Sequence, residues 1–284
     1  MARNRSAVLA GSWYPDSATA CRQQILDFIG PAPDEAVPEG PFVGGIVPHA
    51  GWFFSGQMAC RVVERLATGT AVDTVAIFGM HLHPGSRNIL MADGAWDTPL
   101  GPLTVDAPLA EALRRRFDFK IETADDSTPD NTIEVQLPFI KYFFPDTRIV
   151  PMGVPPVTAS LEIGSAVAEE ARRLGREIRV IGSTDLTHYG ANYGFSPQGR
   201  GSAALDWVRN DNDRRVIDAM VAMAPERVIE EGLTRHNACC SGSAATAVAA
   251  AKALGAERGI ELSYATSYDK HPGDSFVGYV GILY

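Results

Sequence analysis

Residues 74–81 read TVAIFGMH, a short β-branched run that ends in glycine, methionine and histidine. Such a run is typical of a strand that is buried on both faces of a sheet. Similar runs are GGIV at 44–47, RIVPMG at 148–153, IRVIGS at 178–183, ELSYAT at 261–266 and FVGYVGILY at 276–284. The predicted strands are therefore spread over most of the chain.

Segments with helical periodicity separate these strands. They cover residues 17–29, 55–67, 107–116, 161–174, 205–223 and 241–254. Alternation of this kind predicts an α/β fold, in which a central mixed, largely parallel sheet is flanked by helices. The linker-like stretches 31–41 and 190–201 do not separate independent cores. We therefore expect residues 1–284 to form a single domain.

The bulk composition limits the classes of function. The 284 residues are 45% hydrophobic and carry a formal net charge of −9, so we expect neither nucleic-acid nor membrane binding. We find no apolar run of the roughly 20 residues that a membrane helix needs, and no secretory signal. The four cysteines form no dense disulfide framework, so a cytoplasmic location is expected.

Three histidines lie just beyond the carboxyl ends of predicted strands, namely His49, His81 and His188. Ligands of open α/β sheets bind at this edge, where loops converge above rigid strands. A single histidine is more often structural, but three at one edge favour a site. Two imidazoles with one anionic ligand bind a transition metal and leave positions open for oxygen or substrate. We predict His49 and His81 as the first two ligands.

The anionic ligand has several candidates, which are Asp185, Cys239, Glu134 and Asp269. Cys239 precedes a predicted helix of small residues. A helix N-terminus lowers the pKa of a thiol toward the metal-binding thiolate, which favours Cys239. The alternative is a buried structural cysteine, an interpretation that suits the neighbouring Cys240 better.

The segment DLTH places Asp185 and His188 three residues apart after a strand. Both could face one crevice, with the histidine as a general base that the carboxylate orients. Asp185 could equally cap a turn. His83 and His271 precede prolines in loops, and we expect them to face solvent. His81 and His83 also form an HxH pair, which leaves a zinc hydrolase as a further alternative.

Aromatic residues accompany these histidines and could line a pocket for a flat substrate. Trp52 and Phe53 follow His49, although aromatic runs are more often core packing. Tyr189 and Tyr193 carry hydroxyl groups near the DLTH segment, where they could serve substrate or simply close the loop.

Several segments, in this order, together resemble the Memo family, the B component of the AmmeMemoRadiSam grouping. They are AGSWYP at 10–15, PHAGWFFSG at 48–56, GMHLHPG at 79–85, AWDTPLGPLTVD at 95–106, NTIEVQLPFIKY at 131–142, STDLTHYG at 183–190, NACCSG at 237–242 and DSFVGYVGILY at 274–284. The likeness covers nearly the whole chain.

The resemblance implies a fold similar to that of class III extradiol ring-cleaving dioxygenases. It implies His49, His81 and Cys239 as metal ligands, with the cysteine in place of the glutamate of those enzymes. It also implies that His188 with Asp185 takes the position of the acid/base histidine.

Two positions depart from the family pattern. Asn131 stands where the family usually has a histidine, so its role in the pocket is reduced to amide hydrogen bonding. The family stretch Cys-Gly-x-Gly-Pro-Ile reads CCSGSAA here. Keeping Gly242 in register makes Cys239 the ligand, whereas a slip of one residue would exchange it for Cys240.

The sequence thus predicts a metal-dependent redox enzyme that acts on a small aromatic or other oxidisable substrate with O2. A soft thiolate ligand favours iron(II) or copper, with zinc ranked below them. The alternative is a non-enzymatic binding or adaptor protein that uses the same cleft for a peptide or metabolite. The name of the grouping further implies a radical-SAM enzyme and an AMMECR-type protein as partners.

Overall fold

The computed structural model describes residues 4–30 and 40–284, and its centre is a nine-stranded mixed sheet. The strands are β1 (Gly44–Val47), β2 (Thr74–Gly79), β3 (Asn88–Met91), β6 (Phe119–Glu122), β7 (Arg148–Gly153), β8 (Ile178–Ser183), β9 (His188–Tyr189), β10 (Ile260–Thr266) and β11 (Phe276–Leu283). Their order is β10-β11-β1-β8-β2-β7-β3-β6, and β9 pairs with β11. A separate small sheet contains β4 (Ala95–Trp96) and β5 (Leu103–Thr104).

The middle of the large sheet is parallel. Strand β1 pairs with β8, β8 with β2, and β2 with β7 in the same direction. Strands β10 and β11 add antiparallel pairs at one end, and β3 runs antiparallel to β7 near the other. Strands β1, β2 and β8 are buried over their whole length, as continuous apolar runs predict. The predicted α/β class with a mixed, largely parallel sheet is confirmed.

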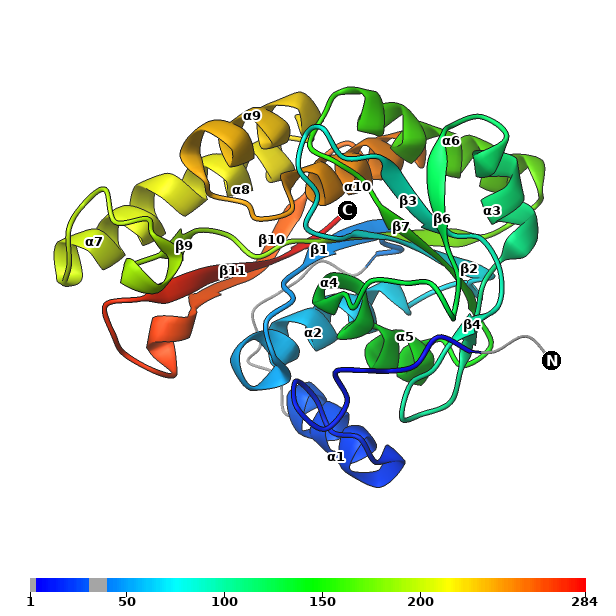
Figure 1. Ribbon diagram of the computed structural model, residues 1–284, viewed down its shortest axis with the longest axis horizontal. Coiled ribbons are helices and arrows are strands. Elements are labelled where there is room, and N and C mark those ends of the chain that lie inside the picture. Colours follow the sequence, from blue (N-terminus) through cyan, green and yellow to red (C-terminus); the bar gives the residue numbers. More distant parts are fainter. Residues whose placement is uncertain (1–3, 31–39) are drawn as a thin grey trace.

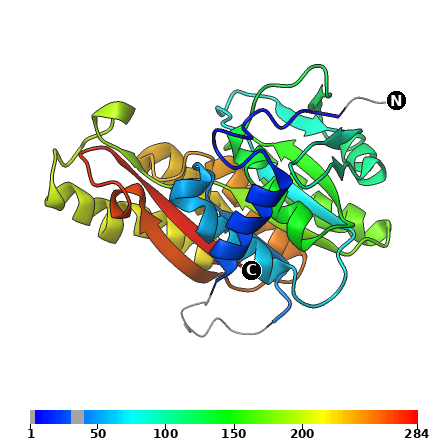
Figure 2. The same ribbon diagram turned by 90° about the horizontal axis from the view of Figure 1, so that it is seen from below.

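Helices cover both faces of the sheet (Figure 1). They are α1 (Ala18–Ile29), α2 (Gln57–Leu66), α3 (Ala107–Arg114), α4 (Asn131–Glu134), α5 (Leu137–Phe143), α6 (Ala159–Arg173), α7 (Ser202–Trp207), α8 (Asp213–Val221), α9 (Pro225–Arg235) and α10 (Ser241–Ala253). On one face α10 packs against β1, β2 and β8, with α6 and α9 beside it. On the other face α2 packs against β1 and β11, and Figure 2 shows α1 in front of the sheet on this side.

Several elements differ from the sequence prediction. The expected helix at 205–223 is divided into α7 and α8 by a π-helical turn, Val208–Asn212. Strands β3 and β6 were not predicted, because each carries only one β-branched side chain, Ile89 and Ile121. The predicted linker at 31–41 lies mostly outside the described residues. Among residues 4–30 and 40–284 we find no helix with the length and continuous hydrophobicity that a bilayer-spanning segment requires.

Asp213, the first residue of α8, holds the connection between β8 and β9 in place. Asp213 is fully buried, and its Oδ1 accepts hydrogen bonds from the backbone N–H and the hydroxyl of Thr187 at 3.1 and 2.5 Å. Its Oδ2 accepts a hydrogen bond of 2.8 Å from the Tyr264 hydroxyl. Burial raises the pKa of Asp213 to about 6, although these hydrogen bonds oppose the shift.

This raised pKa predicts a pH-dependent loss of stability. Between the ordinary aspartate pKa of 3.8 and about 6, folded Asp213 holds a proton that the unfolded chain has released. The free energy of unfolding should therefore fall by about 3 kcal/mol as the pH rises through this window. In Asp213→Asn this contribution is expected to be absent. Urea unfolding between pH 4 and 7 measures it, and the exposed Asp206→Asn is the control. Parallel curves for parent and Asp213→Asn would contradict the prediction.

Candidate metal centre

Four potential donor atoms gather where the carboxyl ends of β1 and β2 meet the N-terminus of α10. His49 follows β1, His81 follows β2, and Cys239 and Cys240 directly precede α10. One donor atom of each residue lies within 4.8 Å of the other three. Nε2 of His49 is 3.2 Å from Sγ of Cys239, and Nδ1 of His81 is 3.3 Å from Sγ of Cys240. The structure therefore brings together the three predicted ligands and adds Cys240.

The hydrogen bonds around His49 determine its tautomer. Oγ of Ser183 donates its only proton to the carbonyl oxygen of Thr132 at 2.7 Å. The same oxygen lies 3.0 Å from Nδ1 of His49 and can therefore only accept a hydrogen bond there. Nδ1 consequently carries a proton, and in neutral His49 the lone pair on Nε2 faces Cys239. This is the form that a metal-binding histidine needs.

Ser183→Ala is expected to weaken metal binding by about 10–100-fold, as is typical when a group that orients a ligand is removed. The substitution frees the tautomer and the ring orientation of His49. A competition titration with a chromophoric chelator measures the change in affinity. Ser160→Ala is the matched control, because Ser160 is equally buried but donates to the carbonyl oxygen of Pro155. An unchanged affinity in Ser183→Ala would contradict the assigned role.

The two cysteines differ in their protonation. Burial alone raises the pKa of Cys239, but hydrogen bonding from Cys240 and the proximity of His49 hold it well below its usual range. Burial and the neighbouring Cys239 sulfur raise the pKa of Cys240 well above its usual range. The sulfur atoms are 3.9 Å apart. Of the two thiols, Cys239 therefore loses its proton more readily and Cys240 keeps its proton more firmly.

Histidine protonation opposes metal binding at the same centre. Burial lowers the pKa of His49, but the negative charges of Asp185 and Cys239 outweigh this effect and raise it to about 9. A hydrogen bond to Cys239 is the main cause of the raised pKa of His81. A metal ion must displace a proton from Nε2 of His49 to bind there.

Asp185 connects the histidine and cysteine segments. Its Oδ1 accepts the backbone N–H of His49 at 2.7 Å, and its backbone oxygen accepts the N–H of Cys239 at 3.1 Å. Its Oδ2 lies 3.9 Å from Nε2 of His49. Burial raises the pKa of this carboxyl group above its ordinary value, and the nearby His49 and His188 oppose this shift only in part. Asp185 therefore lies beside the cluster and positions two of its members.

The position of His81 depends on a strained residue. Met80 precedes it with a φ of 69°, in the left-handed region that non-glycine residues rarely adopt. Its backbone N–H donates to Oγ1 of Thr132 at 2.6 Å, and that hydroxyl donates in turn to the carboxylate of Asp130. Such strain costs about 1–3 kcal/mol and persists where surrounding contacts enforce it, often at functional sites.

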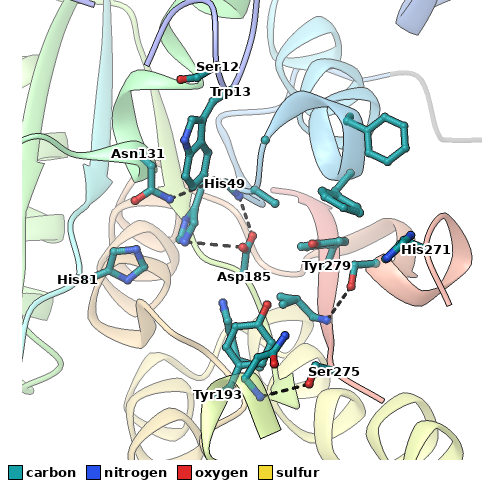
Figure 3. Close-up of a pocket in the computed structure, with 18 residues that line it drawn as sticks. Ser12, Trp13, His49, His81, Asn131, Asp185, Tyr193, His271, Ser275 and Tyr279 are labelled. Carbon is teal, nitrogen blue, oxygen red and sulfur yellow. Dashed lines mark hydrogen bonds and ion pairs between the residues drawn. The ribbon is translucent and has the colours of Figure 1, made fainter. Parts of the chain in front are cut away.

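A cavity of about 710 Å³ opens above the cluster. Figure 3 shows His49 and Asp185 in its middle, with His81 and Asn131 on one side and Tyr279 and His271 on the other. His188 also lines the cavity. Its Nδ1 is 3.1 Å from the carbonyl oxygen of Leu186 and therefore donates a hydrogen bond to it. Nε2 of neutral His188 is then free to accept a proton.

The predicted pocket residues divide into two groups. Phe53 and Asn131 line the cavity, and the amide of Asn131 donates to the carbonyl oxygen of His49 at 3.2 Å. Trp52 lies in the core instead, where it stacks on Phe139 at 4.2 Å. Tyr189 is also fully buried, and its hydroxyl donates to the carbonyl oxygen of Gly199. These two residues do not line the cavity, because their rings pack in the protein interior.

The other candidates for the anionic ligand lie outside the cluster. Glu134 accepts hydrogen bonds from Leu9 and Tyr14, and Asp269 pairs with Arg209. His83 and His271 are exposed, as expected.

Sequence reasoning missed the supporting residues Ser183 and Thr132 and the cavity residue Tyr279. Ser183 could have been noticed, because it ends β8 at the same edge as the histidines. Thr132 and Tyr279 carry no such indication in the sequence.

The fold and the cluster define an α/β protein with a candidate metal centre at the carboxyl edge of its parallel strands. A family model described as Memo-like protein matches residues 5–283, so the chain belongs to the Memo-like family. The predicted family is confirmed.

Relatives of this chain align with it over nearly its whole length. A MEMO1 family protein of Methanopyrus kandleri is 34% identical over 99% of this chain and 98% of its own. One from Methanothermobacter thermautotrophicus is 35% identical over 97% and 98%. The crystal structure of an uncharacterized protein from Escherichia coli K12 shares the fold with a TM-score of 0.54 at 13% identity, covering 84% of this chain and 98% of that one.

Proposed function

We propose that the protein is a metal-dependent redox enzyme, similar to class III extradiol dioxygenases, that oxidises a small aromatic or other oxidisable substrate with O2. The observation that carries this proposal is the convergence of His49, His81 and Cys239 below a cavity that also contains His188. A redox-active metal needs ligands and a vacant position, and the substrate needs room and a base.

The donor set fits a soft or borderline transition metal. A neutral imidazole at His49 and a thiolate at Cys239 are ligands for copper, iron and zinc, whereas magnesium and calcium prefer oxygen. If Cys240 stays a neutral thiol, three protein ligands remain and a coordination position is open. Iron(II) or copper in this place would supply the electron transfer to dioxygen, which zinc would not.

The surrounding residues have separate tasks in this proposal. His188 accepts a proton from a substrate hydroxyl at its free Nε2 and returns it later in the reaction. Asp185 holds the backbone of His49 and lies beside the cluster as a compensating negative charge. The ring of Phe53 in the cavity wall favours a flat apolar substrate.

The test begins with elemental analysis of protein purified without oxygen, followed by oxygen uptake with a panel of catechols. We expect near-stoichiometric iron or copper in the parent and its loss in His49→Ala. His188→Gln should keep the metal but lose oxygen uptake. His83→Gln is the matched control, because His83 is exposed and lies outside the cluster. Absence of metal after reconstitution, or metal without any uptake, would refute the enzyme proposal.

A second candidate function is the recognition of a peptide or metabolite in the same cleft. Three exposed aromatic side chains line the cavity, namely Trp13, Phe53 and Tyr193. Exposed aromatic rings around a hollow are typical of a binding surface. Ligand binding that persists in His49→Ala, together with absent oxygen uptake, would favour this function over the enzyme.

A further inference from the structure

A second cavity of about 650 Å³ reaches the same cluster from another direction. His81, His188 and Tyr193 line both cavities. The rings of His188 and Tyr193 meet edge to face, with centroids 4.9 Å apart. This pair therefore forms part of a partition between the two spaces.

The two cavities contact different members of the cluster. His49 and Asp185 line the first cavity, and Cys239 lines the second. Only His81 of the four clustered residues lines both. A ligand that fills the first cavity would thus leave the Cys239 side of the cluster open toward the second.

The second cavity is suited to an uncharged molecule. Its apolar walls are formed by Leu82, Pro84, Leu186, Phe195, Leu233 and Ala238. The described residues that line it include no Asp, Glu, Lys or Arg, and its ionisable groups are Cys239, Tyr193 and the imidazoles of His81, His83, His188 and His236. The first cavity contains the carboxylate of Asp185. Several of its lining residues are exposed, among them His83, His236 and Leu233 of α9, which is 43% exposed.

We propose that the second cavity is a separate access route, through which a small uncharged molecule such as dioxygen reaches the Cys239 side of the cluster while an organic substrate occupies the first. The identity of the molecule rests on the redox function proposed above. The route itself does not, because it can be measured in protein without metal.

The experiment is alkylation of Cys239 by iodoacetamide in the metal-free protein, followed by peptide mass spectrometry. Cys239 is the least buried of the four cysteines, so its labelling reports access to the cluster. Leu233→Trp should narrow the mouth of the second cavity and slow labelling by about tenfold, since thiol reactions depend on access. Leu233→Ala should maintain or increase the rate. Phe53→Trp is the matched control at the first cavity, and it should change the rate by less than about twofold.

Equal labelling rates in Leu233→Trp and the parent would overturn the proposal, as would a slower rate confined to Phe53→Trp. If the iron-loaded protein consumes oxygen, Leu233→Trp should also raise the KM for O2 and leave the KM for the catechol unchanged. A raised KM for the catechol alone would count against the route. If no oxygen uptake is found, the redox proposal fails while the labelling result still decides whether the route exists.

Discussion

Cys239→Ser is expected to lower metal affinity by more than about 100-fold, a larger loss than the 10–100-fold that removal of a supporting residue causes. Cys240→Ser is expected to change it by less than about tenfold. The difference follows from protonation, because the pKa of Cys239 is held well below its usual range and that of Cys240 well above it. Metal content after dialysis against a chelator, with a competition titration, measures both variants.

Equal losses in the two variants would contradict this prediction. They would mean that both sulfurs and both imidazoles bind the ion. Such a set of four ligands is typical of closed, tetrahedral structural zinc sites, which keep no position for a substrate or oxygen. The pair of cysteine variants therefore tests whether the centre is suited to catalysis before any substrate is known.

Trp52→Ala is expected to lower the free energy of unfolding by about 3–5 kcal/mol, the usual cost of removing a large buried ring. Trp52 is 1% exposed, stacks on Phe139, and donates its indole N–H to the carbonyl oxygen of Val135 at 3.0 Å. The substitution leaves a cavity and removes the partner of that carbonyl group. Urea unfolding of the metal-free protein measures the loss.

Phe53→Ala is the matched control for this substitution, because the neighbouring ring is 64% exposed. Its effect on the free energy of unfolding should stay within about 0.5 kcal/mol, as is usual for surface positions. Comparable losses in the two variants would contradict the assignment of Trp52 to the core and Phe53 to the cavity wall.

The sequence predicted the central strands because they are buried on both faces and therefore read as continuous apolar runs. It predicted His49 and His81 because their places at strand ends fix their position in space. It could not assign Trp52 and Phe53 to core and cavity. The two residues begin a π-helical turn, Trp52–Gly56, so the ordinary helical period does not show which ring faces inward.

The role of Cys240 was also beyond the sequence. Two adjacent residues usually point in different directions, so only one of the cysteines was expected to face the histidines. In the structure the chain turns just before α10, and both sulfurs reach the cluster. Such a turn depends on long-range hydrogen bonds, here from the N–H of Cys239 to Asp185 and from that of Cys240 to Thr184.

The members of the cluster are far apart along the chain, since 190 positions separate His49 from Cys239. A metal ion can find this set of ligands only after the early and late parts of the chain have docked, so binding should be a late event in folding. The bound ion should also act as a cross-link between the early and late parts of the chain, which no covalent cross-link joins. An ion present at 1,000 times its Kd would add about 4 kcal/mol to the free energy of unfolding, and chelation would remove this contribution from both parts of the chain at once.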